Sequence, residues 1–328
     1  MSVVIPAWNA AHLVGTAIDS VLAQTHADLA VLVVDDGSTD ATAEVIERHA
    51  RDPRVTLIRH ARNRGLSAAR NTGMRAARGG YMAFLDADDC WLPNHLEVAM
   101  GALVRHPELD VVFLESEVVD QQTSNPEHLW FEHHRDAFAE FGTTPIGEGF
   151  FSIDSGLLRG LLIGCVAHMQ ALVGRRAFIA AQMFDERLRR SEDLDWLIRA
   201  THDRGMRAAF TREVTSIYLR HGTSLTAKGG SNHEIIERTE LDLFRDYARW
   251  TDLDRRERRL VRKRIAACCV DLAYYARKRG DLRAAWSYVL QGAVMHASGS
   301  QFREAAKIAT SMLSLLRGPR SADASRQP

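Results

Sequence analysis

The sequence predicts an α/β fold in which helices cover both faces of a mostly parallel, Rossmann-like sheet, followed by an all-helical C-terminal extension. Over the first 115 residues, short apolar runs rich in β-branched residues alternate with amphipathic stretches, which is the pattern of strand–helix–strand units. Acidic clusters directly follow two of these runs, where ligands bind in such sheets. After residue 232 the apolar residues recur only at helical spacing.

Strands and helices are expected to alternate along the first part of the chain. The expected strands there are Val3–Ile5, Ala30–Val34, Val55–Ile58, Tyr81–Leu85 and Val111–Leu114. The expected helices between them are Leu13–Leu22, Ala43–Ala50, Ser67–Arg78 and Pro93–Val104. The pattern is weaker over residues 120–165, where we expect a long excursion of the chain away from the regular strand–helix alternation, with short helices. Further on, the pattern predicts strands at Ala171–Val173 and Val214–Leu219 and a helix at Glu192–Arg204.

The last hundred residues read as four helices in succession. They are expected at His233–Trp250, Asp254–Arg279, Asp281–Ala297 and Gln301–Leu316, with Gly280 and Gly299 at helix ends. Leu282, Ala285, Trp286, Val289 and Leu290 share one face of the third helix, and that face needs a partner. We therefore expect an appended helical bundle.

The bulk composition is that of an ordinary globular chain without net charge. The 328 residues are 46% apolar and 26% charged, and 42 basic residues balance 42 acidic ones. We therefore expect no nucleic-acid partner and only local anion sites. The four cysteines form no Cys-x-x-Cys pair, which argues against structural zinc and a disulfide scaffold. No apolar run reaches the roughly 18–20 residues that span a bilayer, and no basic leader precedes the first strand, so we expect a cytoplasmic protein.

The run FLDADD, from Phe84 to Asp89, predicts a metal site. An apolar strand delivers Asp86, Asp88 and Asp89 at its end, where their charges repel one another unless a cation lies among them. Oxygen ligands favour Mg²⁺ or Mn²⁺ over zinc, and Mg²⁺ is usually held by one or two carboxylates together with substrate phosphates. A solvated acidic loop with helix-capping aspartates is the alternative interpretation.

Two further motifs are candidates for nucleotide contacts. In VVDDGSTD, Asp36 follows a buried strand and can accept hydrogen bonds from a base or ribose, although turn and N-cap chemistry would account for the same run. In NRGLSAARNTG, Gly65 permits a tight approach, and Arg64 and Arg70 offer guanidinium groups to phosphate. An ordinary helix with solvated arginines is the alternative for this second motif.

A late acidic pair and a histidine complete the set of candidates. Glu192 and Asp193 stand where a helix is expected to begin, so the helix dipole keeps a carboxylate there ionised. Such a group serves as a general base if it faces the cleft, and is otherwise a capping acid. His221 follows the late strand, where it is either a metal or phosphate ligand or a surface histidine.

Taken in order, these motifs resemble glycosyltransferase family 2, the inverting enzymes of the GT-A fold. VVIPAWNA is similar to the family's first-strand signature, and VDDGSTD, NRGLSAARNTG, FLDADDCWLPNHLE and the ED of SEDLDWLIRA follow in family order. The resemblance covers residues 1 to about 225, roughly two thirds of the chain. One departure is Trp8, which stands where the family commonly has tyrosine.

The resemblance implies which residues contact the nucleotide. Pro6 and Asn9 would border it, and Asp36 would pair with its base, usually uracil in this family. Arg70 would approach the nucleotide or diphosphate, and Asp86 would contact the ribose or the metal.

The same resemblance implies the metal ligands and the catalytic acids. Asp88 would bind the metal directly, and His221 would lie close to the metal and the diphosphate. Asp193 would be the catalytic base, with Glu192 beside it.

These roles imply an inverting, metal-dependent hexosyl transfer. The donor would be a nucleotide-diphosphate sugar, with a UDP-sugar favoured, and the cofactor Mn²⁺ or Mg²⁺. The acceptor would be a hydroxyl of a glycan or lipid-linked intermediate in cell-surface polysaccharide or glycolipid synthesis. Residues 1–115 would then form the nucleotide-sugar-binding half of the GT-A domain, and 116–231 the acceptor-binding half with the base. Residues 232–317 would form the helical extension, and 318–328 a disordered tail.

Two other functions use similar parts. A catalytically idle nucleotide-sugar-binding or scaffold module of a glycan assembly complex would bind the donor without turnover. A nucleotidyltransferase would need a basic, glycine-rich loop after the first strand, where this chain reads PAWNAAHLVG. Basic runs in the helical extension, such as Arg255 to Arg259, either meet anionic lipid at the inner face of the membrane or form a solvated helix face.

Overall fold

The computed structural model describes residues 1–220 and 231–316, and the chain divides into two compact units, Met1–Ala227 and Lys228–Pro328. Each unit has a hydrophobic core of its own. The finer division into four parts stays a prediction. His221 and the predicted disordered tail at 318–328 lie outside the described residues.

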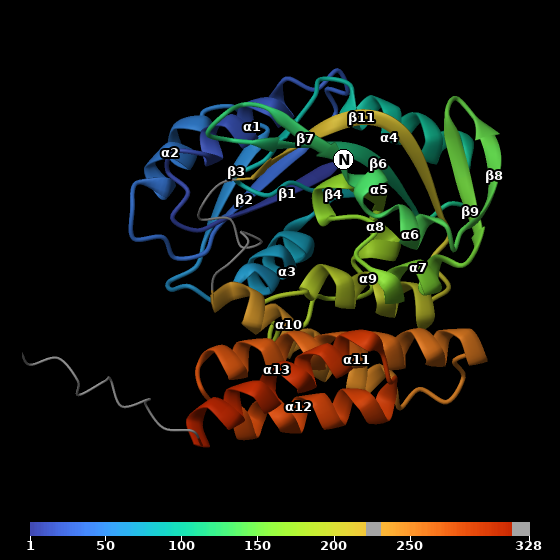
Figure 1. The fold of residues 1–328 in the computed structure, drawn as a ribbon. Coiled ribbons are helices and arrows are strands. Elements are labelled where there is room, and N and C mark those ends of the chain that lie inside the picture. The colour runs from blue at the N-terminus through green and yellow to red at the C-terminus, as the bar shows by residue number, and fades with distance from the viewer. Residues whose placement is uncertain (221–230, 317–328) are drawn as a thin grey trace, which may run out of the picture. The chain divides into compact units, whose positions relative to one another are not determined.

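Among the described residues of the first unit, eleven strands form one mixed sheet (Figure 1). In chain order the strands are β1 Ser2–Ala7, β2 Ala30–Asp35, β3 Val55–Arg59, β4 Tyr81–Phe84, β5 Cys90–Trp91, β6 Val111–Asp120, β7 Pro126–Leu129, β8 Gly142–Gly147, β9 Phe150–Ser155, β10 Leu172–Arg175 and β11 Ala208–Arg220. Their order across the sheet is β3-β2-β1-β4-β10-β6-β11-β9-β8, while β5 pairs with β11 and β7 with β6. The four strands at the β3 edge are parallel, whereas β10 is antiparallel to both of its neighbours.

Helices pack on both faces of this sheet, and the predicted α/β fold is therefore confirmed. The helices of the first unit are α1 Val14–Leu22, α2 Thr42–His49, α3 Leu66–Ala76, α4 His95–Arg105, α5 Trp130–His133, α6 Arg135–Phe138, α7 Leu157–Ile163, α8 Arg176–Ile179 and α9 Glu192–His202. In Figure 1, α1, α2 and α4 lie on one side of the sheet and α3 on the other.

The alternation of side chains along β1 explains this two-sided cover. Val3 and Ile5 point to one face and join a core cluster with residues of α1, α2 and α4. Val4 points to the opposite face, where a Cβ atom at Gly73 of α3 would overlap its side chain. Because Gly73 has no side chain, α3 can approach β1 closely. All three valine and isoleucine side chains are fully buried, as expected for a strand covered on both faces.

The weakly patterned segment after residue 120 contains strands that the sequence did not predict. Short helices were expected there, and α5, α6 and α7 do occur, but β7, β8 and β9 were missed. The strands β8 and β9 form an antiparallel hairpin whose turn holds Glu148 and Gly149 at φ 49° and 75°. Most of β8 is exposed, so it lacks the apolar alternation that marks a half-buried strand.

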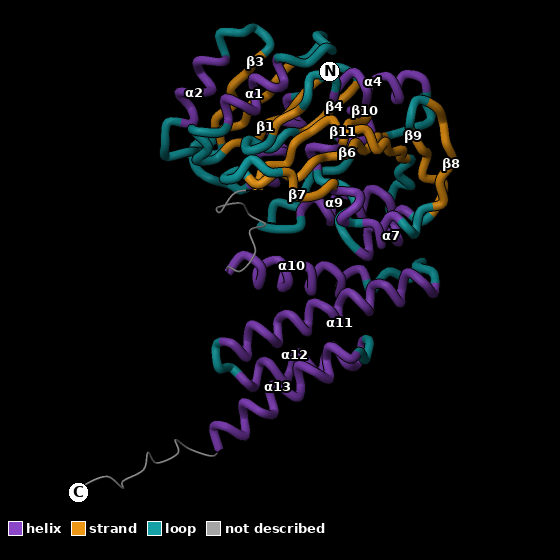
Figure 2. The backbone as a smooth tube through the Cα atoms, turned by 45° about the horizontal axis from the view of Figure 1, so that its top comes forward, coloured by secondary structure: helices purple, strands orange, loops and turns teal. Residues whose placement is uncertain are grey.

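The second unit is helical throughout its described residues, as predicted. Its helices are α10 Ser231–Tyr247, α11 Arg255–Lys278, α12 Leu282–Met295 and α13 Gly299–Leu316, shown as successive helices in Figure 2. Asp254 caps α11 by accepting from the Glu257 N–H, and the Glu257 side chain accepts from the Asp254 N–H in return. None of the described helices is both long and apolar enough to cross a membrane.

The apolar face predicted on α12 is partly correct. Ala285 and Val289 are buried in the core of this unit, where they lie with Ala273 of α11 and Ile308 of α13. Leu290, assigned to the same face, is instead 61% exposed. It stands one residue beyond Val289, and the rotation of about 100° per residue carries its side chain away from α11.

Candidate active site

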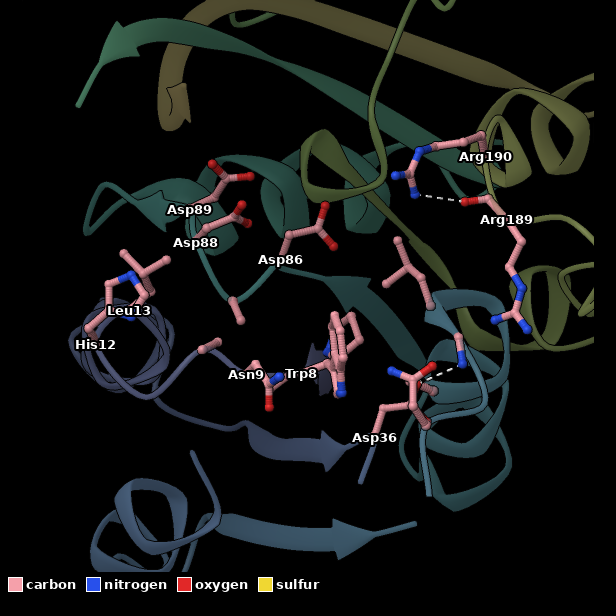
Figure 3. Close-up of a pocket in the computed structure, with 18 of the residues that line it drawn as sticks. Trp8, Asn9, His12, Leu13, Asp36, Asp86, Asp88, Asp89, Arg189 and Arg190 are labelled. Atoms are coloured by element: carbon pink, nitrogen blue, oxygen red, sulfur yellow. Dashed lines mark hydrogen bonds between the residues drawn. The ribbon is translucent and has the colours of Figure 1, made fainter. Parts of the chain in front are cut away.

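A pocket of about 500 Å³ opens where β1, β2 and β4 end at their carboxyl edges. Figure 3 shows its walls, with three aspartates on one side and two arginines on the other. Of the predicted site residues, Pro6, Asn9, Asp36, Asp86 and Asp88 line it. Its location agrees with the rule that ligands of open α/β sheets bind beyond the carboxyl ends of the strands.

The loop after β1 forms the floor of the pocket. Asn9 has a left-handed backbone at φ 50°, a conformation that asparagine tolerates better than most residues. Its N–H donates to Ser38 Oγ at 3.0 Å, and its Oδ1 accepts from the Thr39 N–H at 2.9 Å. These bonds join the loop after β1 to the loop after β2. Trp8, beside Asn9, remains 54% exposed and offers an aromatic surface at the pocket.

Asp36 organises the loop that precedes α3. Its carboxylate accepts from the Arg64 N–H at 2.9 Å and the Gly65 N–H at 2.7 Å, and His60 Nδ1 lies 2.7 Å away. Gly65 has φ 98°, which favours glycine. The expected pairing of Asp36 with a base stays a prediction, and a base would have to share oxygens that already accept two backbone N–H groups.

The acidic loop after β4 has one partly exposed and one deeply buried carboxylate. Asp86 has a side chain 27% exposed, whereas Asp89 is buried and accepts from the Leu219 N–H at 2.8 Å. Burial, together with the charges of Asp88 and Asp86, raises the pKa of Asp89 well above its usual range. Asp89 therefore fixes the loop to β11, and all three aspartates of the loop, Asp86, Asp88 and Asp89, line the pocket.

Arg70 is not among the residues that line the pocket, and it joins two of the predicted site acids. Its Nη2 is 2.8 Å from Asp86 Oδ1, and its Nη1 is 2.7 Å from Glu192 Oε1. The side chain is only 3% exposed. Although burial opposes the charged form, the charges of Asp86, Glu192 and Asp193 raise the pKa of Arg70. The contact with nucleotide expected for Arg70 stays a prediction, because in this structure its guanidinium is held by carboxylates.

Glu192 and Asp193 begin α9, as the sequence predicted. The preceding Ser191 has a left-handed backbone at φ 57°. Asp193 is half-buried, and its Oδ1 accepts from the Leu194 N–H at 2.8 Å. Burial and the charge of Glu192 raise the pKa of Asp193 to about 7, against the opposing charge of Arg70, so the expectation that the helix start keeps this carboxylate ionised is wrong below that pH. A carboxyl group with this pKa can exchange a proton near neutral pH.

The carboxylates at the pocket fit a divalent cation that arrives with phosphate. Asp86 and Asp88 offer hard oxygen ligands, which suit Mg²⁺ or Mn²⁺. Within residues 1–220 and 231–316, no group of three or more His, Cys, Asp or Glu side chains could hold a metal ion. One or two carboxylates with water and substrate phosphates are a usual Mg²⁺ site, so the donor set fits a cation completed by the diphosphate.

Two arginines of the pocket were not among the predicted site residues. Arg189 and Arg190 stand just before the ED pair and line the wall opposite the aspartates (Figure 3). A Cβ atom at Gly65 would lie 2.7 Å from Arg189 Nη1, so the absence of a side chain at Gly65 leaves room for this guanidinium. The double arginine in RRSED was the available signal. Tyr218, near the end of β11, also lines the pocket.

The comparison of sequences identifies glycosyltransferases. The model of glycosyl transferase family 2 matches residues 2–161. An uncharacterized glycosyltransferase of Rickettsia felis is 28% identical over 224 residues, which cover 68% of this chain and 34% of that protein. The UDP-Glc:alpha-D-GlcNAc-diphosphoundecaprenol beta-1,3-glucosyltransferase WfgD of Escherichia coli is 38% identical over 107 residues, 32% of this chain and 42% of that protein. The chain thus spans about a third of the first relative's length and less than half of the second's.

The comparison of structures identifies the fold. S. aureus TarS 1–349 in complex with UDP-GlcNAc is similar with a TM-score of 0.60 and 16% identity, over 98% of this chain and 93% of that one. The mannosyltransferase PcManGT from Pyrobaculum calidifontis, in complex with GDP-Man and Mn²⁺, has a TM-score of 0.55 and 20% identity, over 97% and 81%. Both are glycosyltransferases of the GT-A type. Residues 2–161 therefore match glycosyl transferase family 2, and the chain has the GT-A fold.

Proposed function

We propose that this glycosyltransferase moves a sugar from a nucleotide-diphosphate donor, with UDP as the favoured nucleotide, onto an acceptor hydroxyl with inversion at the anomeric carbon. The observation that carries the proposal is the Arg70 bridge. It links Asp86, in the wall of the pocket, to Glu192, the neighbour of Asp193. One network thus connects the proposed donor site with the proposed base.

The pocket provides complementary groups for each part of such a donor. The amide-rich loops around Asn9 and Asp36 suit a nucleoside, and the exposed ring of Trp8 offers a surface for stacking. Arg189 and Arg190 suit the diphosphate, because guanidinium groups bind phosphate oxygens with parallel hydrogen bonds. UDP-GlcNAc and GDP-Man bound to the two structural relatives support a nucleotide-sugar donor.

Asp193 is the proposed base of a single displacement. Its ionised carboxylate takes the proton of the acceptor hydroxyl as that oxygen forms a bond to the anomeric carbon. The bond from the anomeric carbon to the diphosphate oxygen breaks on the opposite face, and the nucleoside diphosphate leaves with that electron pair. A positioned base of this kind contributes about 10²–10⁴-fold to the rate.

Asp86 and Asp88 are the proposed holders of Mn²⁺ or Mg²⁺, with His221 as a further proposed ligand. When bound, the cation would offset the negative charge that grows on the departing diphosphate. The Mn²⁺ in the complex of PcManGT supports a divalent cofactor.

We assign donor binding and acceptor binding to successive parts of the chain. Apart from Arg189, Arg190 and Tyr218, every residue of the pocket belongs to the proposed donor half, residues 1–115. Residues 116–231 would supply the base and bind the acceptor. A diphosphoundecaprenol compound in the name of the E. coli relative supports a lipid-linked acceptor. The proposed role is polysaccharide or glycolipid synthesis at the cytoplasmic face of a membrane.

A thermal-shift panel of nucleotide sugars, with and without Mn²⁺, tests the donor and cofactor together. We expect a UDP-sugar to raise the melting temperature in the presence of Mn²⁺ and much less without it. Release of UDP from that donor, followed by chromatography, then tests turnover. Binding without any release or transfer would favour an idle binding module, and release of pyrophosphate would favour a nucleotidyltransferase.

A further inference from the structure

The first turns of α11 carry a dense group of exposed cations. Residues 255–263 contain five arginines and one lysine, and all six are exposed. We call Arg255, Arg256, Arg258, Arg259, Arg262 and Lys263 the basic face. At about 100° per residue their side chains fall within an arc of about 160°. The opposite side of the same turns is buried through Val261 and Ile265.

Four cations of the basic face are not neutralised by carboxylates in the way that other arginines of this unit are. Six of those arginines lie beside an acid: Arg238, Arg245, Arg249, Arg264, Arg277 and Arg279. Across the part of the unit that the structure describes, Arg255, Arg259, Arg262 and Lys263 form no ion pair. The one acid among residues 255–263 is Glu257, whose carboxylate accepts from the Asp254 N–H in the cap. The positive charge of these four side chains is therefore available to an external anion.

We propose that the basic face binds anionic phospholipid headgroups and holds the enzyme on the surface of a membrane. The six cations extend over about 12 Å of a straight helix, so they form a row that can meet a flat layer of phosphates at once. Guanidinium groups suit phosphate because they bind two of its oxygens together. Each cation near an anionic leaflet strengthens binding about fivefold.

Two observations favour a lipid surface over nucleic acid. Residues 255–263 contain no aromatic side chain on which a base could stack. The net charge of the chain is zero, so no wider field would attract a polyanion to other faces. The choice also rests on the proposed function, because a lipid-linked acceptor lies in a membrane.

Flotation of the full chain with lipid vesicles tests the proposal. The probes are vesicles of phosphatidylcholine alone and vesicles with about 30% phosphatidylglycerol, in low salt and near 1 M salt, where the screening length falls to about 3 Å. We expect binding only to the anionic vesicles and only in low salt. The variant Arg255→Gln, Arg259→Gln, Arg262→Gln and Lys263→Gln should bind at least tenfold more weakly.

Two further variants separate the basic face from net charge and from folding. Arg48→Gln, Arg51→Gln, Arg283→Gln and Arg303→Gln remove the same number of exposed cations from scattered positions, and this variant should bind vesicles like the wild type. Changing Arg255, Arg259 and Arg262 to Lys keeps the charge and should also preserve binding.

Three results would overturn the proposal: no binding to anionic vesicles, equal loss in the scattered variant, or binding of single-stranded RNA through the basic face without vesicle binding. A donor-induced thermal shift measured on the same samples keeps the two proposals apart. Vesicle binding without donor binding would overturn only the proposed function.

Discussion

Arg70 Nη1 lies 2.7 Å from Glu192 Oε1, although the two residues are 122 positions apart in the chain. The same guanidinium reaches Asp86 with its other terminal nitrogen. A single buried cation thus joins helix α3, the acidic loop after β4 and the start of α9. Three motifs that are separate in the sequence share one electrostatic network.

Replacement of Arg70 should destabilise the protein strongly. Arg70→Met leaves Glu192 buried without its cation, and removal of one partner from a buried ion pair costs about 3–5 kcal/mol. Urea unfolding of the two proteins measures this loss. Arg187→Met is the control, because the Arg187 side chain is 90% exposed and its substitution should change stability by less than about 0.5 kcal/mol. Equal stability of both variants would contradict a structural role for the bridge.

Asp193→Asn should abolish most transfer and leave donor binding intact. An amide cannot accept the hydroxyl proton, so the turnover number should fall about 10²–10⁴-fold. Turnover and the dissociation constant of the donor are measured separately, by product release and calorimetry. Asp203→Asn, at the end of the same helix, is the matched control and should keep full turnover. Near-normal turnover of Asp193→Asn would remove this residue from the mechanism.

Transfer should increase with pH through about 7. The raised pKa of Asp193, about 7, means that its carboxyl group is largely protonated at pH 6 and cannot act as a base. Turnover should therefore fall roughly tenfold for each pH unit below 7 and level off above it. A profile measured at saturating donor and acceptor checks this. A rate that is flat between pH 5.5 and 8 would show that Asp193 does not limit turnover.

The raised pKa of Asp193 also predicts that Asp193→Asn is more stable than the wild-type protein. A carboxyl group with a raised pKa in the folded state destabilises that state as pH rises from its unfolded value, near 3.9, toward 7. The amide removes this cost, so the variant should melt higher at pH 8, and the gain should shrink at pH 4. A gain of about 1 kcal/mol in the free energy of unfolding corresponds to a rise of roughly 2–4 °C in the melting temperature of a domain of this size. Scanning calorimetry of the variant and the wild type at the two pH values measures this gain. A lower melting temperature of the variant at pH 8 would contradict the raised pKa of Asp193.

Removal of divalent metal should stop transfer. We expect excess chelator to abolish product formation and added Mn²⁺ to restore it, because the charge on the leaving diphosphate is then offset again. Asp88→Asn should lose most activity at ordinary Mn²⁺ and lose the Mn²⁺-dependent thermal shift with donor. Glu186→Gln, an acid outside the pocket, serves as the control. Full transfer in chelator would exclude the metal from the reaction.

Gly73→Ala should disturb the contact between α3 and β1. The added methyl group would overlap the buried side chain of Val4, and overpacking of this kind costs about 1–3 kcal/mol. Gly80→Ala is the matched control, because its added Cβ meets nothing within 4 Å. Denaturant midpoints of the two variants measure the difference. An unchanged midpoint for Gly73→Ala would show that α3 can move aside without cost.

Local patterns in the sequence were sufficient for the parallel half of the sheet and for the four late helices. Buried strands such as β1 and β2 are continuous apolar runs, and α11 has a capping acid at Asp254 with a glutamate three residues on. The hairpin β8–β9 could not be predicted in this way, because its pairing depends on contacts between exposed polar strands rather than on an apolar repeat.

The candidate site was predictable in its residue types and less so in its connections. Motif order indicated Asp86 and Asp193. Asp86 lines the pocket, Asp193 is not among its lining residues, and the roles of both stay predictions. The bridge through Arg70 could not be read from the motifs, because a buried arginine and a phosphate-binding arginine have the same local sequence. Arg189 and Arg190 were both missed. The position of Arg189 depends on the open space at Gly65, 124 positions earlier, which no local motif indicates.

The hydrogen bond from the Leu219 N–H to Asp89 has a consequence for protein engineering. It joins the acidic loop to a strand 130 positions later, so we expect the conformation of each segment to depend on the other. A chimera that takes residues 1–115 from one relative and the rest from another would break this match wherever the strand backbone differs. Exchange of donor specificity should therefore succeed only when the acidic loop and β11 are transplanted as a pair.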